Sequence, residues 1–210
     1  MNYLISIFAM SFTIALAGAL APGPLLTAVV AKSPKYGFKT GPLLMIGHAV
    51  AEILMIAVIV SGFSRFMENP LLIKMIALLG GIILIFFGLG MIRKTPSLST
   101  ETATSKNGVS NLPFLGMTVS MSNPYWTIWW FTIGLGLVLA AQKAGFLALL
   151  VFFLGHILAD IGWYSIVSFA VSRGRKFISD RIYRGIMKTC GAILTGFGIY
   201  FISGFFKNSI

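Results

Sequence analysis

Six long apolar runs, almost free of charged side chains, constrain the fold of this 210-residue chain more than any other feature. They span approximately residues 3–31, 41–63, 70–92, 113–140, 145–171 and 183–206. Each run is long enough to cross a bilayer, and none alternates apolar and polar residues as a half-buried strand does. Because lipid offers no partner to backbone N–H and C=O groups, such runs must be helical or form a closed barrel. The sequence therefore predicts an all-α integral membrane protein with six transmembrane helices.

The composition agrees with a membrane protein and not with a soluble or nucleic-acid-binding one. Hydrophobic residues make up 57% of the chain and charged residues only 10%, which a soluble domain of this size does not need. The net charge of +11 is spread over short segments between the apolar runs. No basic face with stacking aromatic residues accompanies it, so we expect a lipid bilayer and no nucleic acid as partner.

The Lys and Arg residues are distributed unequally over the two sides of the predicted membrane. The segments after the first, third and fifth runs hold three, three and six of them, whereas the opposite side holds four. Because positively charged short loops remain in the cytoplasm, we expect a multi-pass protein of the cell membrane. Both termini would lie outside, and the Ser/Thr-rich linker 95–111 would lie in the cytoplasm.

A six-residue motif occurs twice in the chain. Gly-His-Ala-Val-Ala-Glu at 47–52 is followed, 108 residues later, by Gly-His-Ile-Leu-Ala-Asp at 155–160. Together with the linker, this duplication divides the chain into a first three-helix repeat, 1–94, and a second, 112–210. Since three is an odd number, the second repeat enters the membrane from the opposite side, which predicts a pair of inverted repeats, an organisation found in transporters.

Each copy of the motif places a His and a carboxylate on one helix face, because residues four apart lie one turn from each other. Glu52 and Asp160 are the only acidic residues inside the apolar runs, where charge is expensive. We expect them to carry a proton or to bind a cationic group of a substrate. A structural hydrogen bond to a neighbouring helix is the alternative.

The two imidazoles suit two different chemistries. Histidine titrates near neutrality, so His48 and His156 fit proton relay or hydrogen bonding to a substrate, which we favour. The same imidazoles and carboxylates also fit a divalent ion such as zinc or manganese. The alternative metal ligands are His48, Glu52, His156 and Asp160.

Proline interrupts the first helix of each half. The breaks lie at Pro22-Gly23-Pro24 and at Asn123-Pro124, and both predict a kink or an unwound turn. An unwound turn exposes backbone polar groups inside the bilayer, as in the binding sites of transporters. The alternative is a kink that only shapes helix packing.

Aromatic and small residues flank the two breaks. Trp126 follows the second break and is expected to line a cavity. Trp129 and Trp130 fit a place at the membrane interface equally well. The small residues between 15 and 21 are expected to allow close helix packing without a ligand.

The sequence contains no Gly-x-Ser-x-Gly motif of hydrolases, no Walker-type nucleotide-binding loop, no Cys-x-x-Cys and no His-Glu-x-x-His motif of zinc proteases. We expect neither an enzyme nor a cofactor.

The ordered set of motifs resembles the LysE/RhtB family of amino-acid exporters. The shared features are Ala-Pro-Gly-Pro at the end of the first helix, Asn-Pro in the fourth, and acidic residues in the second and fifth. The resemblance implies functional roles for Pro22, Gly23, Pro24, Glu52, Asn123, Pro124 and Asp160. This sequence differs from the family pattern at Tyr125, where the family usually has Lys, and in its paired Gly-His motif.

The sequence thus predicts a secondary transporter that exports an amino acid or a similar small metabolite, driven by an ion gradient, most simply of protons. The alternative is an exporter of a divalent metal ion such as cadmium, manganese or zinc. The expected partners are the small-molecule substrate and the coupling ion, and a homodimer is left open.

Overall fold

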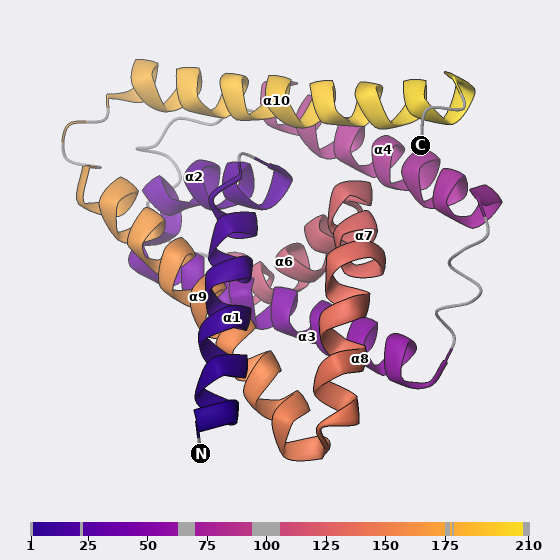
Figure 1. Cartoon of the computed structure of the whole chain (residues 1–210). Coiled ribbons are helices and arrows are strands. Elements are labelled where there is room, and N and C mark those ends of the chain that lie inside the picture. Colours follow the sequence, from indigo (N-terminus) through magenta and orange to yellow (C-terminus); the bar gives the residue numbers. More distant parts are fainter. Residues whose placement is uncertain are drawn as a thin grey trace.

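The structure is a computed structural model, and it describes residues 2–21, 23–62, 70–93, 106–174, 177 and 179–207. All regular elements in these residues are helical (Figure 1). Six helical segments are long and apolar enough to cross a membrane. The prediction of an all-α protein with six membrane-spanning helices is confirmed.

The described residues of the first half form four helices and one short 3₁₀ turn. They are α1 (Asn2–Ala19), α2 (Pro24–Tyr36), η1 (Gly37–Lys39), α3 (Thr40–Val60) and α4 (Pro70–Arg93). The first apolar run is interrupted as predicted, because helix α1 ends at Ala19 and α2 starts with Pro24 at its first position. Gly23 between them is extended, with φ −156° and ψ −178°. Pro22 lies outside the described residues. Helix α2 continues beyond the predicted limit at residue 31 and is joined to α3 through η1.

The second half also starts with an interrupted apolar span, which is more fragmented than the first. It comprises α5 (Lys106–Ser110), α6 (Leu112–Met121), α7 (Pro124–Trp129), the π-helical turn η4 (Trp130–Gly134), α8 (Leu135–Lys143), α9 (Phe146–Gly174) and α10 (Asp180–Lys207). The second predicted break is confirmed: α6 ends at Met121, and α7 begins at Pro124, with the Asn123 side chain accepting a hydrogen bond from the Tyr125 N–H. Most of the linker, residues 95–105, lies outside the described residues, and its last part forms α5.

Glycines allow the longest helices to cross in close contact. A methyl group added to Gly47 of α3 would overlap the Pro113 carbonyl of α6, and one added to Gly155 of α9 would lie 2.7 Å from the Phe8 carbonyl of α1. Helices α4 and α10 cross in the same way at Gly81–Gly198 and Gly88–Gly191. Small residues permit this approach, which drives helix association where lipid removes the hydrophobic effect.

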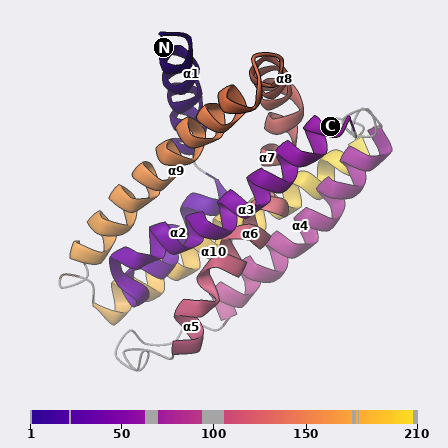
Figure 2. The ribbon, with the colours of Figure 1, turned by 90° about the horizontal axis from the view of Figure 1, so that it is seen from below.

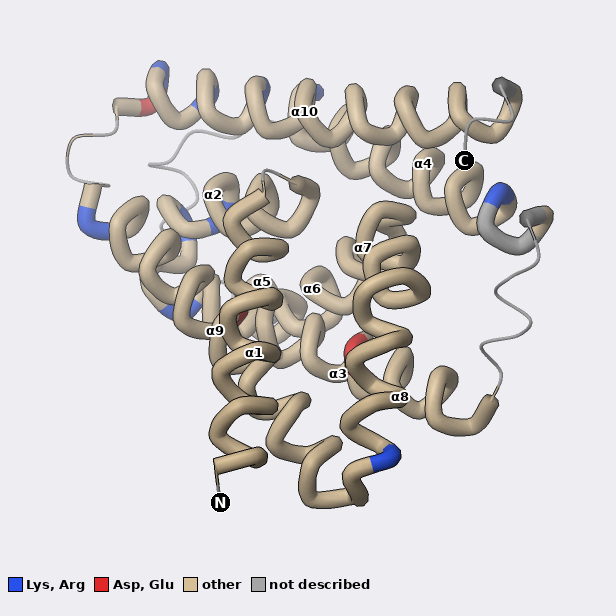
Figure 3. Tube along the Cα trace, in the orientation of Figure 1, with Lys and Arg blue, Asp and Glu red and all other residues tan. Residues whose placement is uncertain are grey.

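The basic residues are distributed unequally over the helices. Figure 2 shows α4 and α10 side by side, with the start of α9 near α1 and α8. In Figure 3, Lys and Arg are concentrated near the end of α9, the start of α10 and α2, whereas α8 ends on a single basic residue, Lys143. The orientation of the termini and the inverted relation of the halves stay predictions.

Candidate substrate and ion site

A cavity of about 270 Å³ lies where the two interrupted spans meet α3, α9 and α10. Its wall combines a polar region, built from the repeated motifs, with aromatic and small residues. The residues that line it are Ala15, Gly18, Ala19, Ala21, Gly23, Pro24, Leu25, His48, Glu52, Ser120, Asn123, Tyr125, Trp126, Trp129, Trp130, His156, Asp160, Tyr164, Phe197, Tyr200 and Phe201. The two motifs, 108 residues apart in sequence, therefore face one cavity.

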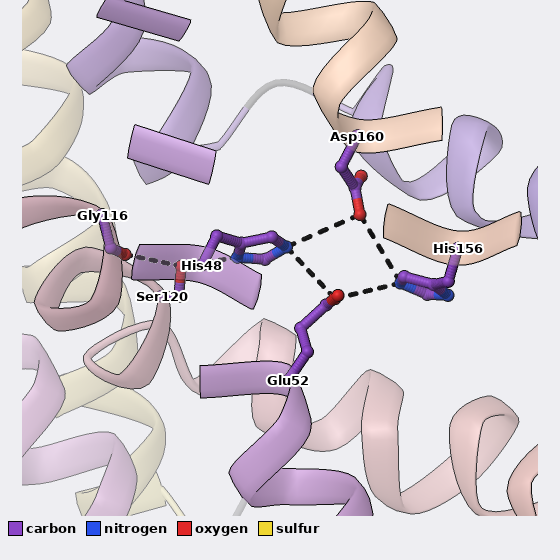
Figure 4. A network of polar contacts seen from close by, with 6 residues as sticks. All are labelled: His48, Glu52, Gly116, Ser120, His156 and Asp160. Atoms are coloured by element: carbon purple, nitrogen blue, oxygen red, sulfur yellow. Dashed lines mark hydrogen bonds and ion pairs between the residues drawn. The ribbon is translucent and has the colours of Figure 1, made fainter. Parts of the chain in front are cut away.

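The four ionisable side chains of the motifs form a closed ring in which nitrogen and oxygen alternate (Figure 4). Glu52 Oε1 lies 3.1 Å from His48 Nε2 and 3.0 Å from His156 Nε2. Asp160 Oδ2 lies 3.6 Å and 3.7 Å from the same two nitrogens. We call these four residues the acid–histidine ring. The ring forms because α3 and α9 pack against each other and each presents its motif to the contact.

The acid–histidine ring is buried, so its charges must balance. The exposed fraction of each of the four side chains is between 1% and 6%. Two ionised carboxylates without compensating charge would be very costly in this environment. Two positive charges are needed when both carboxylates are ionised, and either two protons on the imidazoles or one divalent cation supplies them. The ring is thus suited to exchange protons for a cationic ligand.

Ser120 holds one histidine of the ring in a fixed orientation. Its hydroxyl donates to the Gly116 carbonyl at 2.8 Å, and its oxygen lies 2.7 Å from His48 Nδ1. A serine hydroxyl has a single hydrogen, which is used here for Gly116, so His48 Nδ1 must carry the hydrogen shared with Ser120. This contact directs His48 Nε2 towards both carboxylates (Figure 4). Sequence reasoning missed Ser120, whose only signal was a hydroxyl just before the Asn-Pro break.

Tryptophan rings form the wall on one side of the acid–histidine ring. The ring centroids of Trp129 and Trp130 both lie 5.2 Å from that of His156, and the centroid of Trp126 lies 6.4 Å from that of His48. Trp126 lines the cavity as predicted. Trp130 also lines the cavity and is fully buried within the protein. A π-helical turn starts at Trp130 and interrupts the regular helix beside the cavity. Such turns occur frequently at functional sites.

Three of the remaining predicted residues line the same cavity. Gly23, Pro24 and Asn123 line the cavity. Pro124 is buried at the start of α7 and is not part of the lining, and Pro22 lies outside the described residues. The small residues of α1 were expected only to pack, yet Ala15, Gly18, Ala19 and Ala21 line the cavity. Sequence reasoning also missed Phe197, Tyr200 and Phe201 of α10, because nothing in their local pattern differs from that of a lipid-facing helix.

Several polar atoms around the cavity have no hydrogen-bond partner among the described residues. They are Glu52 Oε2, Trp126 Nε1, Trp130 Nε1, His156 Nδ1 and Asp160 Oδ2. Buried polar atoms normally find a partner, so this concentration at one cavity points to a polar ligand. Ligand atoms of His48, Glu52 and Asp160 also lie within 4.8 Å of one another, close enough to suit a metal ion.

Comparison with known proteins places the chain among membrane transporters. The family model described as LysE type translocator matches residues 16–204. A relative in Bacillus subtilis (strain 168), named "Putative amino acid efflux protein YcgF", is 24% identical over 181 residues, which cover 85% of this chain and 87% of the relative. No solved structure matches. The match over nearly the whole chain shows that this protein belongs to the LysE type translocators, a family of membrane transporters.

Proposed function

We propose that this protein exports an amino acid, or a similar small metabolite, in exchange for protons across the cell membrane. The observation that carries the proposal is the acid–histidine ring in the wall of the cavity, where imidazole nitrogens and a carboxylate oxygen from both halves of the chain lie within hydrogen-bond distance. The amino-acid class follows the name of the Bacillus subtilis relative, which describes amino acid efflux.

The ring would couple the two movements by competition for the same carboxylates. Without substrate, protons on the imidazoles balance Glu52 and Asp160. An ammonium group that reaches Glu52 Oε2 and Asp160 Oδ2, which accept no hydrogen bond from the described residues, supplies positive charge in place of one proton, so one proton leaves the ring as the substrate binds. Because binding of either species disfavours the other, substrate movement in one direction drives proton movement in the opposite direction.

The interrupted helices would supply the neutral part of the site. The first N–H groups of α2, beside Gly23 and Pro24, have no partner within the helix, and they lie at the cavity. Such groups bind anionic atoms without an additional charged side chain. Asn123 at the second break already uses its Oδ1 atom to cap α7.

The test is transport by the purified protein in proteoliposomes. Standard L-amino acids are loaded one at a time, and efflux is followed with and without an imposed pH gradient. We expect at least one amino acid whose flux rises with an outward-to-inward proton gradient and whose exit acidifies the lumen. Efflux that ignores the pH gradient would contradict proton coupling, and absence of efflux for all of them would contradict the amino-acid assignment.

Export of a divalent metal ion is the second candidate, supported by the close approach of His48, Glu52 and Asp160. Cadmium, manganese and zinc are the ions to test, by melting temperature and by direct binding. If metal is the cargo, the purified protein should bind it with an affinity that falls steeply as the ligands take up protons. Replacing His48 by Ala should remove this binding. Unchanged melting temperatures with all three ions would rule out this alternative.

A further inference from the structure

The cavity lacks a cationic side chain for the carboxylate of an amino acid. Among the described residues that line it, Glu52 and Asp160 are acidic and none is Lys or Arg. If the proposed function is correct, a zwitterion must nevertheless be bound at both ends. The carboxylates of the ring can bind its ammonium group, and hydrogen-bond donors must bind its carboxylate. The first N–H groups of α2 are one set of donors at the cavity, and side chains of the cavity wall are another.

Two helix contacts correspond to each other in the two halves. Helix α1 packs against α9 through residues that are equivalent to those through which α6 packs against α3. Gly47 of α3 meets Pro113 of α6, and Gly155 of α9 meets Phe8 of α1. A second pair of contacts agrees: Gly116 lies against the Leu44 carbonyl, and the Ser11 hydroxyl donates to the Phe152 carbonyl. In both pairs, the contact residue of α9 comes 108 residues after that of α3, and the contact residue of α6 comes 105 residues after that of α1.

This register makes Ala15 the equivalent of Ser120. Where Ser120 accepts a hydrogen bond from His48 Nδ1, the first half has a methyl group, and His156 Nδ1 has no hydrogen-bond partner among the described residues. His156 is only 5% exposed, so this nitrogen cannot be satisfied by bulk water. Both Ala15 and His156 line the cavity, so the place that a serine hydroxyl would otherwise occupy lies at the cavity wall.

A second donor faces the same stretch of α1. The side chain of a residue at Gly18 would point towards Trp129 Nε1, 3.9 Å away, and Gly18 lies one turn after Ala15 on the same helix face. Glycine and alanine therefore leave room beside an imidazole nitrogen and an indole N–H. An indole N–H only donates, which suits a carboxylate and not an ammonium group.

We propose that His156 Nδ1 and Trp129 Nε1, beside Ala15 and Gly18, form the binding subsite for the substrate's carboxylate. The carboxylate accepts from His156 Nδ1–H as Ser120 accepts from His48 Nδ1–H. The proton between His156 Nε2 and Glu52 Oε1 is retained, whichever of the two atoms holds it. The two equivalent histidines thus differ in function: His48 is bound to the protein through Ser120, and His156 binds the substrate.

The chain has only two histidines, so ¹⁵N-histidine NMR reports on each imidazole separately. His48→Gln assigns the signals. The probes are the standard L-amino acids and, for each one that raises the melting temperature, its methyl ester, which keeps the ammonium but lacks the carboxylate. We expect the amino acid to move the Nδ1 signal of His156 and to leave that of His48 nearly unchanged, and the ester to move neither Nδ1 signal.

The variant Ala15→Ser gives His156 the partner that His48 already has. It should weaken amino-acid binding about fivefold, the equivalent of one hydrogen bond, and leave binding of the ester unchanged. Ala17→Ser, on the exposed face of the same helix, is the matched control and should change neither. Trp129→Phe, which retains an aromatic ring without the N–H, should reproduce the selective loss if Ala15→Ser does not fold.

Two results would overturn this inference while the proposed function stands. One is amino-acid flux with an unchanged His156 Nδ1 signal, and the other is an equal loss of amino-acid and ester binding in Ala15→Ser and Trp129→Phe. Failure of the proposed function would look different, because no standard amino acid would be transported by the wild-type protein at all.

Discussion

At the scale of single residues, Glu52 and Asp160 decide whether transport depends on protons. Glu52→Gln and Asp160→Asn retain size and shape but cannot ionise. We expect both variants to fold, since an imidazole can release its proton when its carboxylate partner is neutralised and no unpaired charge then stays buried. Gradient-driven efflux should be lost, because the ring can no longer exchange protons for substrate. If the carboxylates bind the ammonium group directly, binding should weaken by roughly 2–5 kcal/mol as well.

The measurement is flux in proteoliposomes with and without a pH gradient, next to a direct binding assay. Asp180→Asn, at the start of α10 and outside the cavity lining, is the control for removal of a carboxylate. Wild-type flux with wild-type pH dependence in the double variant would show that the two acids serve the structure alone.

At the scale of helices, close crossings hold the repeated motifs in contact. Gly47 directly precedes His48, and a methyl group added there would overlap the Pro113 carbonyl and lie 2.8 Å from the Met117 nitrogen. Gly47→Ala must therefore move α6 away from α3, and this movement should break the hydrogen bond between Ser120 and His48. We expect a loss of about 1–3 kcal/mol in stability, typical of overpacking, together with weaker transport.

Gly136 in α8 is the matched control for this prediction, because an added methyl group meets nothing within 4 Å. Gly136→Ala should be neutral or slightly stabilising, since alanine favours helix more than glycine does. Melting temperatures of the two variants in detergent make the comparison. Equal melting temperatures would mean that the α3–α6 crossing does not depend on the missing side chain.

At the scale of the whole molecule, the orientation in the membrane is open to a direct test. Cys190 is the only cysteine and is buried, so Cys190→Ala gives a background without reactive thiols. A cysteine at Lys143, in the last turn of α8, should react with a membrane-impermeant reagent added to intact cells. A cysteine at Lys106 should react only after the membrane is opened. The reverse pattern would invert the proposed topology and place both termini in the cytoplasm.

The sequence alone determined the helices, their two interruptions and the pairs of ionisable residues, because all of these depend on neighbours in the chain. Apolar length sets a membrane helix, proline breaks it, and a spacing of four residues puts His48 with Glu52 and His156 with Asp160 on a face. The repeat even indicated that the two pairs belong together.

Only the tertiary structure decided what surrounds these pairs. Ser120 is 72 residues from His48 in sequence, and the wall formed by Phe197, Tyr200 and Phe201 comes from the last helix. Such contacts depend on which helices cross and in what register, and local sequence patterns carry no information about either. The same reason applies to Ala15, because its proposed equivalence to Ser120 follows only once α1 is placed against α9.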